Sequence, residues 1–276
     1  MASGQGNLDR DEVLFLTRAM VESGDRLDWK EPVVVDKHCI GGVEPDGLLD
    51  LVAHPLGIGG GKGFVAITGP IGAGKTTVFN LVTGLMPLDA GSIYFDGKKI
   101  NGLQPHQITR MGISRTFQIT RDLQELTVLE NMVVQSEVKG FWDMFGTSML
   151  KEEENRAMDL LSFVGIDHLA YEKSKNLSYG QKKLLEFASV LMSDPRMIML
   201  DEPAGGVNPT LLESLIDRIL QLNQKGITFL IVEHNMDLVM KISNPVICMA
   251  YGTVLAQGSP KEIQDDPRVL EAYLGE

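Results

Sequence analysis

Residues 69–77 form a glycine-rich segment that ends in a lysine and two threonines. The segment fits G-x-x-x-x-G-K-[ST], in which glycines let the backbone wrap so that successive N–H groups point at phosphate oxygens. Lys75 supplies a positive charge for the β and γ phosphates, and the Thr76 hydroxyl is the expected Mg²⁺ ligand. The sequence therefore predicts a phosphate loop with these contact residues: Gly69, Pro70, Ile71, Gly72, Ala73, Gly74, Lys75, Thr76 and Thr77. A glycine-rich turn with a chance lysine is the alternative, and the flanking pattern disfavours it.

An acidic pair, Asp201-Glu202, follows the apolar run 197–200. If that run is a buried parallel strand, its end faces the same edge of the sheet as the phosphate loop. Asp201 would then reach Mg²⁺, often through water, and Glu202 can accept a proton from an attacking water. A lone Asp-Glu pair is commonly a solvated strand end, but the phosphate loop upstream favours the functional interpretation.

A third candidate is the stretch Leu177-Ser178-Tyr179-Gly180-Gln181, which precedes an apolar helical pattern. Ser178 can cap that helix and offer its hydroxyl, with the Gly180 N–H, to an anion. From the residues alone, an ordinary helix N-cap is the simpler interpretation.

The elements that must position these residues alternate between strands and helices, which predicts a parallel sheet covered on both faces. Residues 122–192 are expected to be mostly helical, with Lys151 to Val164 the clearest amphipathic stretch. A helix is expected to begin after an Asn208 cap with Pro209 in its first turn, and to end at Gly226. The other expected elements are strands at 64–68, 197–200 and 228–232, a helix at 76–82, and a hairpin at 91–100 turning at Asp96-Gly97.

Composition limits the class of protein. The 276 residues carry a net charge of −12 with a pI of about 4.9, which argues against general nucleic-acid binding. Cys39 and Cys248 have the spacing of neither a disulfide framework nor a zinc site, and a reducing cytoplasm is the default expectation. The first 30 residues fit no signal peptide, and no apolar run is long enough to span a bilayer. Any work at a membrane would go through partners.

From about residue 63 onward the chain resembles the nucleotide-binding subunits of ABC transporters. Residues 69–77 match Walker A, 197–202 match Walker B, and 177–181 match the signature motif L-S-x-G-Q. Gln118 matches the Q-loop, Asn208 lies where the D-loop falls, and His234 matches the switch histidine. The resemblance implies an α/β P-loop NTPase of ABC type, with a mostly parallel sheet core, an antiparallel β subdomain and a helical subdomain.

The resemblance also implies a mechanism. Two such subunits, identical or different, meet head to tail and hold ATP and Mg²⁺ between Walker A of one and Ser178, Gly180 and Gln181 of the other. Glu202 polarises the water, His234 contacts the γ phosphate, and Gln118 senses Mg²⁺, with Thr76 and Asp201 as further metal ligands. Taken in isolation, Gln118 is more simply interpreted as a surface amide and His234 as a helix-capping histidine. The implied partners are transmembrane permease subunits and a solute-binding protein, at the cytoplasmic face of the membrane.

A narrower resemblance links the chain to ATPase subunits of branched-chain amino acid importers. It rests on residues 112–118, the LSYGQ form of the signature, the segment 204–209 and the tail 266–276. Similar ATPases serve urea, and a further cousin extracts lipopolysaccharide. Other chains select the cargo, so the cargo follows from the resemblance alone.

The N-terminal region departs from the ABC pattern. An ungapped alignment puts Pro45 and Asp46 where an aromatic residue normally stacks on adenine, and residues 12–43 instead resemble a fragment of thymidine and AMP phosphorylases. We therefore expect an atypical segment at 1–45 and an ABC domain at 46–276, with the helical subdomain at about 122–192. Loss of stacking predicts ATP binding that is about 5- to 150-fold weaker and poorly base-selective. A non-transport ABC ATPase, a fusion product with impaired nucleotide binding and a nucleoside phosphorylase remain the alternatives.

Overall fold

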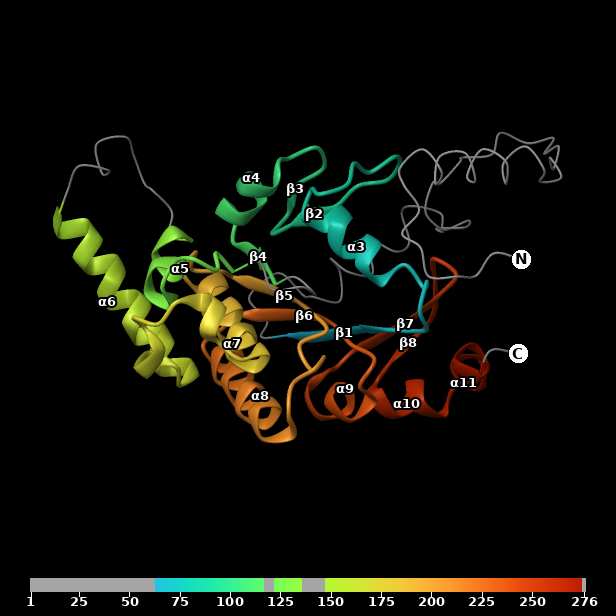
Figure 1. Cartoon of the computed structure of the whole chain (residues 1–276). Coiled ribbons are helices and arrows are strands. Elements are labelled where there is room, and N and C mark those ends of the chain that lie inside the picture. The colour runs from blue at the N-terminus through green and yellow to red at the C-terminus, as the bar shows by residue number, and fades with distance from the viewer. Residues whose placement is uncertain (1–62, 117–121, 136–146, 275–276) are drawn as a thin grey trace, which may run out of the picture. The chain divides into compact units, whose positions relative to one another are not determined.

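The structure is a computed structural model that describes residues 63–116, 122–135 and 147–274 (Figure 1). Several expectations lie outside these described residues. They concern the phosphorylase-like segment 12–43, the missing adenine-stacking aromatic residue and Gln118.

A six-stranded sheet forms the centre of the described part. Its strands stand in the order β4-β5-β6-β1-β7-β8, and all are parallel except β8, which pairs antiparallel with β7. The prediction of a mostly parallel sheet is therefore confirmed. The strands are β1 (Phe64–Thr68), β4 (Ile113–Arg115), β5 (Met197–Asp201), β6 (Thr228–Val232), β7 (Val246–Ala250) and β8 (Thr253–Gly258).

The predicted hairpin forms a small separate sheet of β2 (Tyr94–Phe95) and β3 (Lys98–Lys99). Asp96 and Gly97, the two turn residues, have φ angles of 53° and 70°. Positive φ at both central positions is the geometry of a two-residue turn whose twist matches the strands it joins. The Asp-Gly pair therefore explains both the place and the type of this turn.

Helices cover both faces of the large sheet (Figure 1). As predicted, Asn208 caps α8, accepting a hydrogen bond from the Leu211 N–H at 2.9 Å; the helix ends at Gln224, two residues before Gly226. None of the helices in the described ranges is both long enough and apolar enough to cross a lipid bilayer. The helices are α3 (Lys75–Val82), α4 (Pro105–Arg110), α5 (Val128–Val134), α6 (Thr147–Val164), α7 (Tyr179–Leu191), α8 (Pro209–Gln224), α9 (Met236–Ile242), α10 (Pro260–Asp265) and α11 (Pro267–Leu274).

The core lies on both sides of the central strands. One buried cluster joins the sheet to α5, α6, α7 and α8 and includes Leu161, Leu185 and Phe229. A second cluster lies under α3 and includes Phe79 and Met199. Strands that are buried on both faces are rigid, so they can fix the positions of residues at their ends, as a functional site requires.

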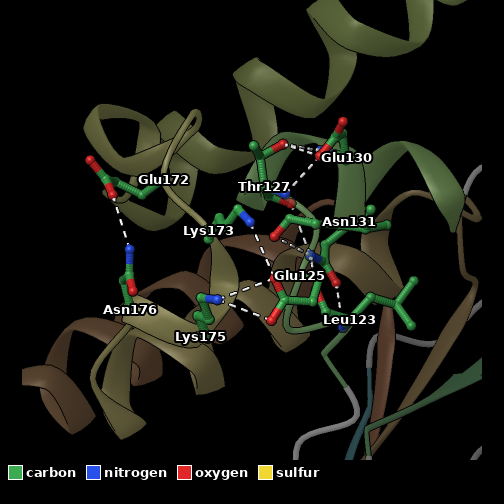
Figure 2. Close-up of polar contacts among 10 residues, drawn as sticks. Leu123, Glu125, Thr127, Glu130, Asn131, Glu172, Lys173, Lys175 and Asn176 are labelled. Carbon is green, nitrogen blue, oxygen red and sulfur yellow. Dashed lines mark hydrogen bonds and ion pairs between the residues drawn. The ribbon is translucent and has the colours of Figure 1, made fainter.

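Polar contacts fix the start of α5 against the segment that leads into α7 (Figure 2). The Glu125 carboxylate accepts from Lys173 at 3.1 Å and from Lys175 at 3.0 Å. The Asn131 side chain accepts from the Leu123 N–H at 2.7 Å and donates to the Leu123 carbonyl at 3.1 Å. The two Glu125 ion pairs join the residues just before α5 to the segment that leads into α7, while the Asn131 side chain holds the chain at Leu123.

Candidate functional site

Three adjacent strands in the middle of the sheet, β5, β6 and β1, deliver the predicted site residues. The strands are parallel, so their carboxyl ends lie at one edge. The phosphate loop follows β1, the pair Asp201-Glu202 stands at the end of β5, and His234 comes two residues after β6. The topology thus brings together three segments that are far apart in the sequence.

The phosphate loop closes around the ammonium group of Lys75. Its Nζ donates to the carbonyl oxygen of Gly69 at 2.7 Å and to that of Pro70 at 3.0 Å. Gly69 has a φ of 142°, and a Cβ atom there would lie 2.0 Å from the Met249 carbonyl oxygen. Gly74 precedes α3 in a left-handed conformation with a φ of 94°. Only glycine suits these two positions, and the loop leads directly into the N-terminus of α3, where the helix dipole favours an anion.

Both acidic residues, Asp201 and Glu202, interact electrostatically with the ammonium group of Lys75. Partial burial lowers the pKa of the Lys75 ammonium, while the negative charges of Glu202 and Asp201 act in the opposite direction. Lys75, Asp201 and Glu202 therefore lie close enough to interact electrostatically. A half-buried cation beside two carboxylates suits the recognition of a phosphate and its counter-ion.

Asp201 is buried, and its partner is Arg115. The guanidinium of Arg115 lies 2.7 Å from Oδ2 of Asp201, and the two side chains are 6% and 2% exposed. Arg115 also donates to Oδ1 of Asn80 at 2.7 Å and lies over the ring of Phe79. In the sequence, Arg115 is a candidate only as part of the stretch 112–118. The pairing depends on β4 lying beside β5, and no sequence pattern we used indicates that neighbourhood.

Glu202 and His234, two of the three predicted catalytic side chains, lie close together. The distance from Nδ1 of His234 to Oε1 of Glu202 is 3.7 Å, and the side chains are 60% and 26% exposed. Glu202 has a φ of 49°, which is uncommon for a residue with a side chain. Such backbone strain is often found at functional sites. Here it occurs at the turn that follows β5.

Glu233 is a site residue to which sequence analysis gave no role. It is completely buried. Its Oε2 accepts from the N–H groups of His234 and Asn235, each at 2.9 Å, and its Oε1 accepts from the Ala204 N–H at 2.8 Å. A buried carboxylate needs such partners to offset its desolvation. Glu233 thereby ties the His234 loop to the segment that follows Glu202, and its position between a buried strand and a histidine was the available signal.

The signature segment 177–181 caps α7. The Oγ of Ser178 accepts from the Gln181 N–H at 3.3 Å, and the Gln181 side chain accepts from the Ser178 N–H at 2.8 Å. The N-cap interpretation is therefore confirmed. Because the Ser178 oxygen accepts in this capping box, its hydroxyl hydrogen can still point outward to an acceptor.

The signature segment also packs against the segment around Asn208 in the same chain. A Cβ atom at Gly180 would lie 2.5 Å from Cδ2 of Leu211. One at Gly206 would lie 2.7 Å from Cε1 of Tyr179. Two glycines thus let residues 177–181 and 204–211 form one continuous surface.

Asp122, directly after the range that contains Gln118, contacts the signature helix. It hydrogen bonds the Ser174 hydroxyl and forms an ion pair with the Lys182 ammonium at 2.9 Å. Burial raises the pKa of the Asp122 carboxyl, but the hydrogen bonds from Ser174 and Lys182 outweigh it and lower the pKa. Asp122 therefore connects the end of the Gln118 segment to α7 as a carboxylate.

A parallel sheet whose central strands end in a phosphate loop and an acidic pair defines a P-loop nucleotide-binding protein. Residues 61–205 match the family model described as ABC transporter. Residues 253–276 match a second family model, described as branched-chain amino acid ATP-binding cassette transporter. The chain belongs to the ABC transporter family, and it is an ATP-binding and ATP-hydrolysing subunit.

Curated relatives support this assignment. A probable branched-chain amino acid transport ATP-binding protein LivG from Archaeoglobus fulgidus is 42% identical over 236 residues, which cover 83% of this chain and 91% of the relative. The high-affinity branched-chain amino acid transport ATP-binding protein BraF from Pseudomonas aeruginosa is 40% identical, over 78% of this chain and 88% of the relative. The resemblance of residues 12–43 to phosphorylases is not supported by these comparisons.

Solved structures show the same fold. A nucleotide-free ATP-binding cassette from an ABC transporter superposes with a TM-score of 0.69 at 36% identity, covering 78% of this chain and 89% of that one. An ATP-binding cassette in its ADP conformation superposes with a TM-score of 0.68, also at 36% identity and with the same coverage. The predicted ABC-type P-loop fold is therefore confirmed.

Proposed function

We propose that this subunit powers the import of branched-chain amino acids. Two observations support the cargo: the names of the relatives and the match of residues 253–276 to a family model of that description. A non-transport ABC ATPase is the weaker candidate, because that C-terminal match has a transport description. Transmembrane permease subunits and a solute-binding protein would complete the system, with this subunit peripheral at the cytoplasmic face of the membrane.

The observation that carries the assignment of roles is the convergence of three segments at the ends of β5, β6 and β1. Residues 69–77 would hold the phosphates of ATP, with Lys75 as the point charge. Glu202 would accept a proton from the attacking water, and His234 would contact the γ phosphate. The 3.7 Å between Glu202 and His234 is short enough for both to act on one water and one phosphate.

A magnesium ion is the proposed metal at this edge. Asp201 and Thr76 offer the oxygen ligands that Mg²⁺ prefers, and Gln118 is the third proposed ligand. Within the described ranges, no group of three His, Cys, Asp or Glu side chains could hold a metal alone. That is consistent with Mg²⁺, which is usually bound by one or two carboxylates together with substrate phosphates. When bound, the ion would neutralise charge on the phosphates.

The exposed signature segment is the proposed second half of the ATP site. Tyr179 is 47% exposed, and Ser178 and Gln181 lie at the surface. In a head-to-tail dimer, Ser178, Gly180 and Gln181 of one subunit would face the phosphate loop of the other. The contacts of Asp122 with α7 support a route from Gln118 to this surface, by which nucleotide binding would act on the permease subunits.

The division into an atypical segment at 1–45 and an ATP-binding domain at 46–276, with a helical subdomain at about 122–192, stays a prediction. So does the weakened ATP binding expected from the missing aromatic residue. Affinities for ATP and GTP measured on the purified chain test that expectation. Tight binding with strong preference for ATP would contradict it.

The role of Glu202 is tested with Glu202→Gln. The amide cannot take up the proton, so the variant should bind ATP, turn it over at least about 100-fold more slowly and accumulate as a dimer. Turnover and size-exclusion chromatography with Mg-ATP measure both effects. Turnover at the wild-type rate would show that Glu202 is not the general base.

Lys75→Ala should weaken nucleotide binding itself, and unaltered binding would contradict the phosphate-loop assignment.

A further inference from the structure

The C-terminal helix α11 contacts the residue from which the phosphate loop begins. The hydroxyl of Tyr273 lies 2.6 Å from Oγ1 of Thr68. Thr68 is the last residue of β1 and directly precedes Gly69. In Figure 1, α11 lies at the right, near the end of β1 from which the chain enters the loop. A contact across 205 residues of sequence therefore links the chain's C-terminal region to its ATP site.

The Tyr273–Thr68 contact is partly buried, and Tyr273 itself is 40% exposed. Thr68 is fully buried, and its hydroxyl also approaches Sδ of Met236 at 3.9 Å. Burial raises the pKa of the Tyr273 hydroxyl, although hydrogen bonds from Thr68 and from the Gly69 backbone act in the opposite direction. The phenol therefore stays neutral near neutral pH and keeps its hydrogen bond with the Thr68 hydroxyl. Leaving the buried Thr68 hydroxyl without a hydrogen-bond partner would cost free energy, and this cost favours the contact with Tyr273.

Helix α11 rests on a firm base. Its Val269 is 4% exposed and belongs to a buried cluster with Val246 of β7 and Ile263 of α10. At the start of the helix, Oδ1 of Asp266 accepts from the Arg268 N–H at 2.9 Å. Tyr273 is therefore presented by a packed helix, which is how residues that fix a site's geometry are best supported.

Gly69, the residue after Thr68, connects the Tyr273–Thr68 contact to the phosphate loop. Its carbonyl oxygen accepts from Lys75 at 2.7 Å, and a Cβ atom at this position would lie 2.0 Å from the Met249 carbonyl oxygen, so the backbone of Gly69 packs directly against that of Met249. We propose that Tyr273 is a positioning residue for ATP binding, which holds Thr68 and Gly69 so that the phosphate loop is set in its binding geometry. This inference rests on the proposed role of residues 69–77. It extends the site to the segment 253–276 that the second family model matches.

The test uses the full chain and two variants that each remove one hydroxyl, Tyr273→Phe and Thr68→Val. Each should weaken Mg-ATP binding by about 2- to 10-fold, the loss expected for one hydrogen bond. The double variant should bind no more weakly than either single one, because both remove the same contact. The loss should persist for ATP in EDTA, since the contact acts on the loop and not on the metal. Thr68→Ser, which keeps the hydroxyl, should bind like the wild type.

Two controls separate positioning from stability. Tyr171→Phe removes the hydroxyl of a tyrosine that is 79% exposed, and it should leave binding unchanged. Melting temperatures without nucleotide show whether α11 is merely less stable. Unchanged ATP affinity in Tyr273→Phe and Thr68→Val, with or without a lower melting temperature, would overturn the proposal. If Lys75→Ala also left binding unaltered, the phosphate-loop assignment itself would fail.

Discussion

Arg115 and Asp201 form a buried ion pair between β4 and β5, with 2.7 Å between the guanidinium nitrogen and Oδ2. The pair joins the residue that opens the Gln118 segment to the proposed Mg²⁺ ligand. Asp201 also donates its backbone N–H to the Thr116 hydroxyl at 3.2 Å. The carboxylate is therefore held in one orientation from the side of β4, and its position depends on Arg115 as much as on its own strand.

Removing the Arg115 charge should destabilise the protein. Arg115→Met leaves the Asp201 carboxylate buried without its cation, and we expect the free energy of unfolding to fall by about 3–5 kcal/mol. Asp201→Asn in the same chain removes the uncompensated charge and should restore a large part of that loss. Urea unfolding of the two variants measures both effects. Wild-type stability in Arg115→Met would contradict the importance of the pair.

Lys75→Met should lower the affinity for ATP by about 10- to 150-fold, since a charge-assisted hydrogen bond to phosphate is lost.

The contribution of Lys75 to the stability of the nucleotide-free protein should change with pH. The pKa of Lys75 is lowered in the folded state, so keeping its charge costs stability at neutral pH. That cost disappears as the pH rises through the lowered pKa toward the unfolded value of about 10.4.

The difference in unfolding free energy between Lys75→Met and the wild type should therefore shift in favour of the wild type as the pH rises toward the unfolded pKa of about 10.4. Urea titrations at several pH values measure it. Lys99→Met, at an exposed hairpin lysine, is the matched control and should show no such trend. A difference independent of pH would mean that burial does not penalise the Lys75 charge.

Gly69→Ala tests the tight wrap of the phosphate loop. Its new Cβ would meet the Met249 carbonyl oxygen, whereas a Cβ at Gly97 would meet nothing within 4 Å although Gly97 also has a positive φ. Gly97→Ala should cost about 1–2 kcal/mol from backbone strain alone. Gly69→Ala should cost about 1–3 kcal/mol more and lose ATP binding. If Gly69→Ala were as stable as Gly97→Ala and still bound ATP, the phosphate loop would be able to accommodate a Cβ atom at position 69, contrary to this prediction.

Cys248 should resist thiol reagents in the folded protein. Burial, with a smaller contribution from Asp266, raises the pKa of its thiol to about 11. At pH 8 the thiolate is then roughly 100-fold scarcer than for an ordinary cysteine, and alkylation slows accordingly. Iodoacetamide labelling followed by peptide mass spectrometry distinguishes Cys248 from Cys39, and unfolding in urea should restore the reactivity of Cys248. Rapid labelling of Cys248 in the folded protein would contradict its burial.

The local elements of the site follow from the sequence with little loss. The strand at 64–68, the hairpin turn at Asp96-Gly97 and the Asn208 cap of α8 stand as predicted. Helix α3 begins one residue earlier than expected, at Lys75, because Gly74 takes the left-handed conformation directly before it. Each of these features depends on a few neighbouring residues, whose backbone preferences and hydrophobic spacing act over short stretches of chain.

The partners of the site residues were decided by tertiary structure. Arg115 meets Asp201 across 86 residues, Glu233 reaches Ala204 across 29, and Tyr273 reaches Thr68 across 205. These contacts depend on the strand order β4-β5-β6-β1-β7-β8, in which neighbours in space are not neighbours in the chain. The sequence alone determined which residues could bind phosphate and move a proton. Only the packed sheet decided which side chains orient these site residues. A buried charge needs a partner, but the sequence does not say which distant residue will supply it.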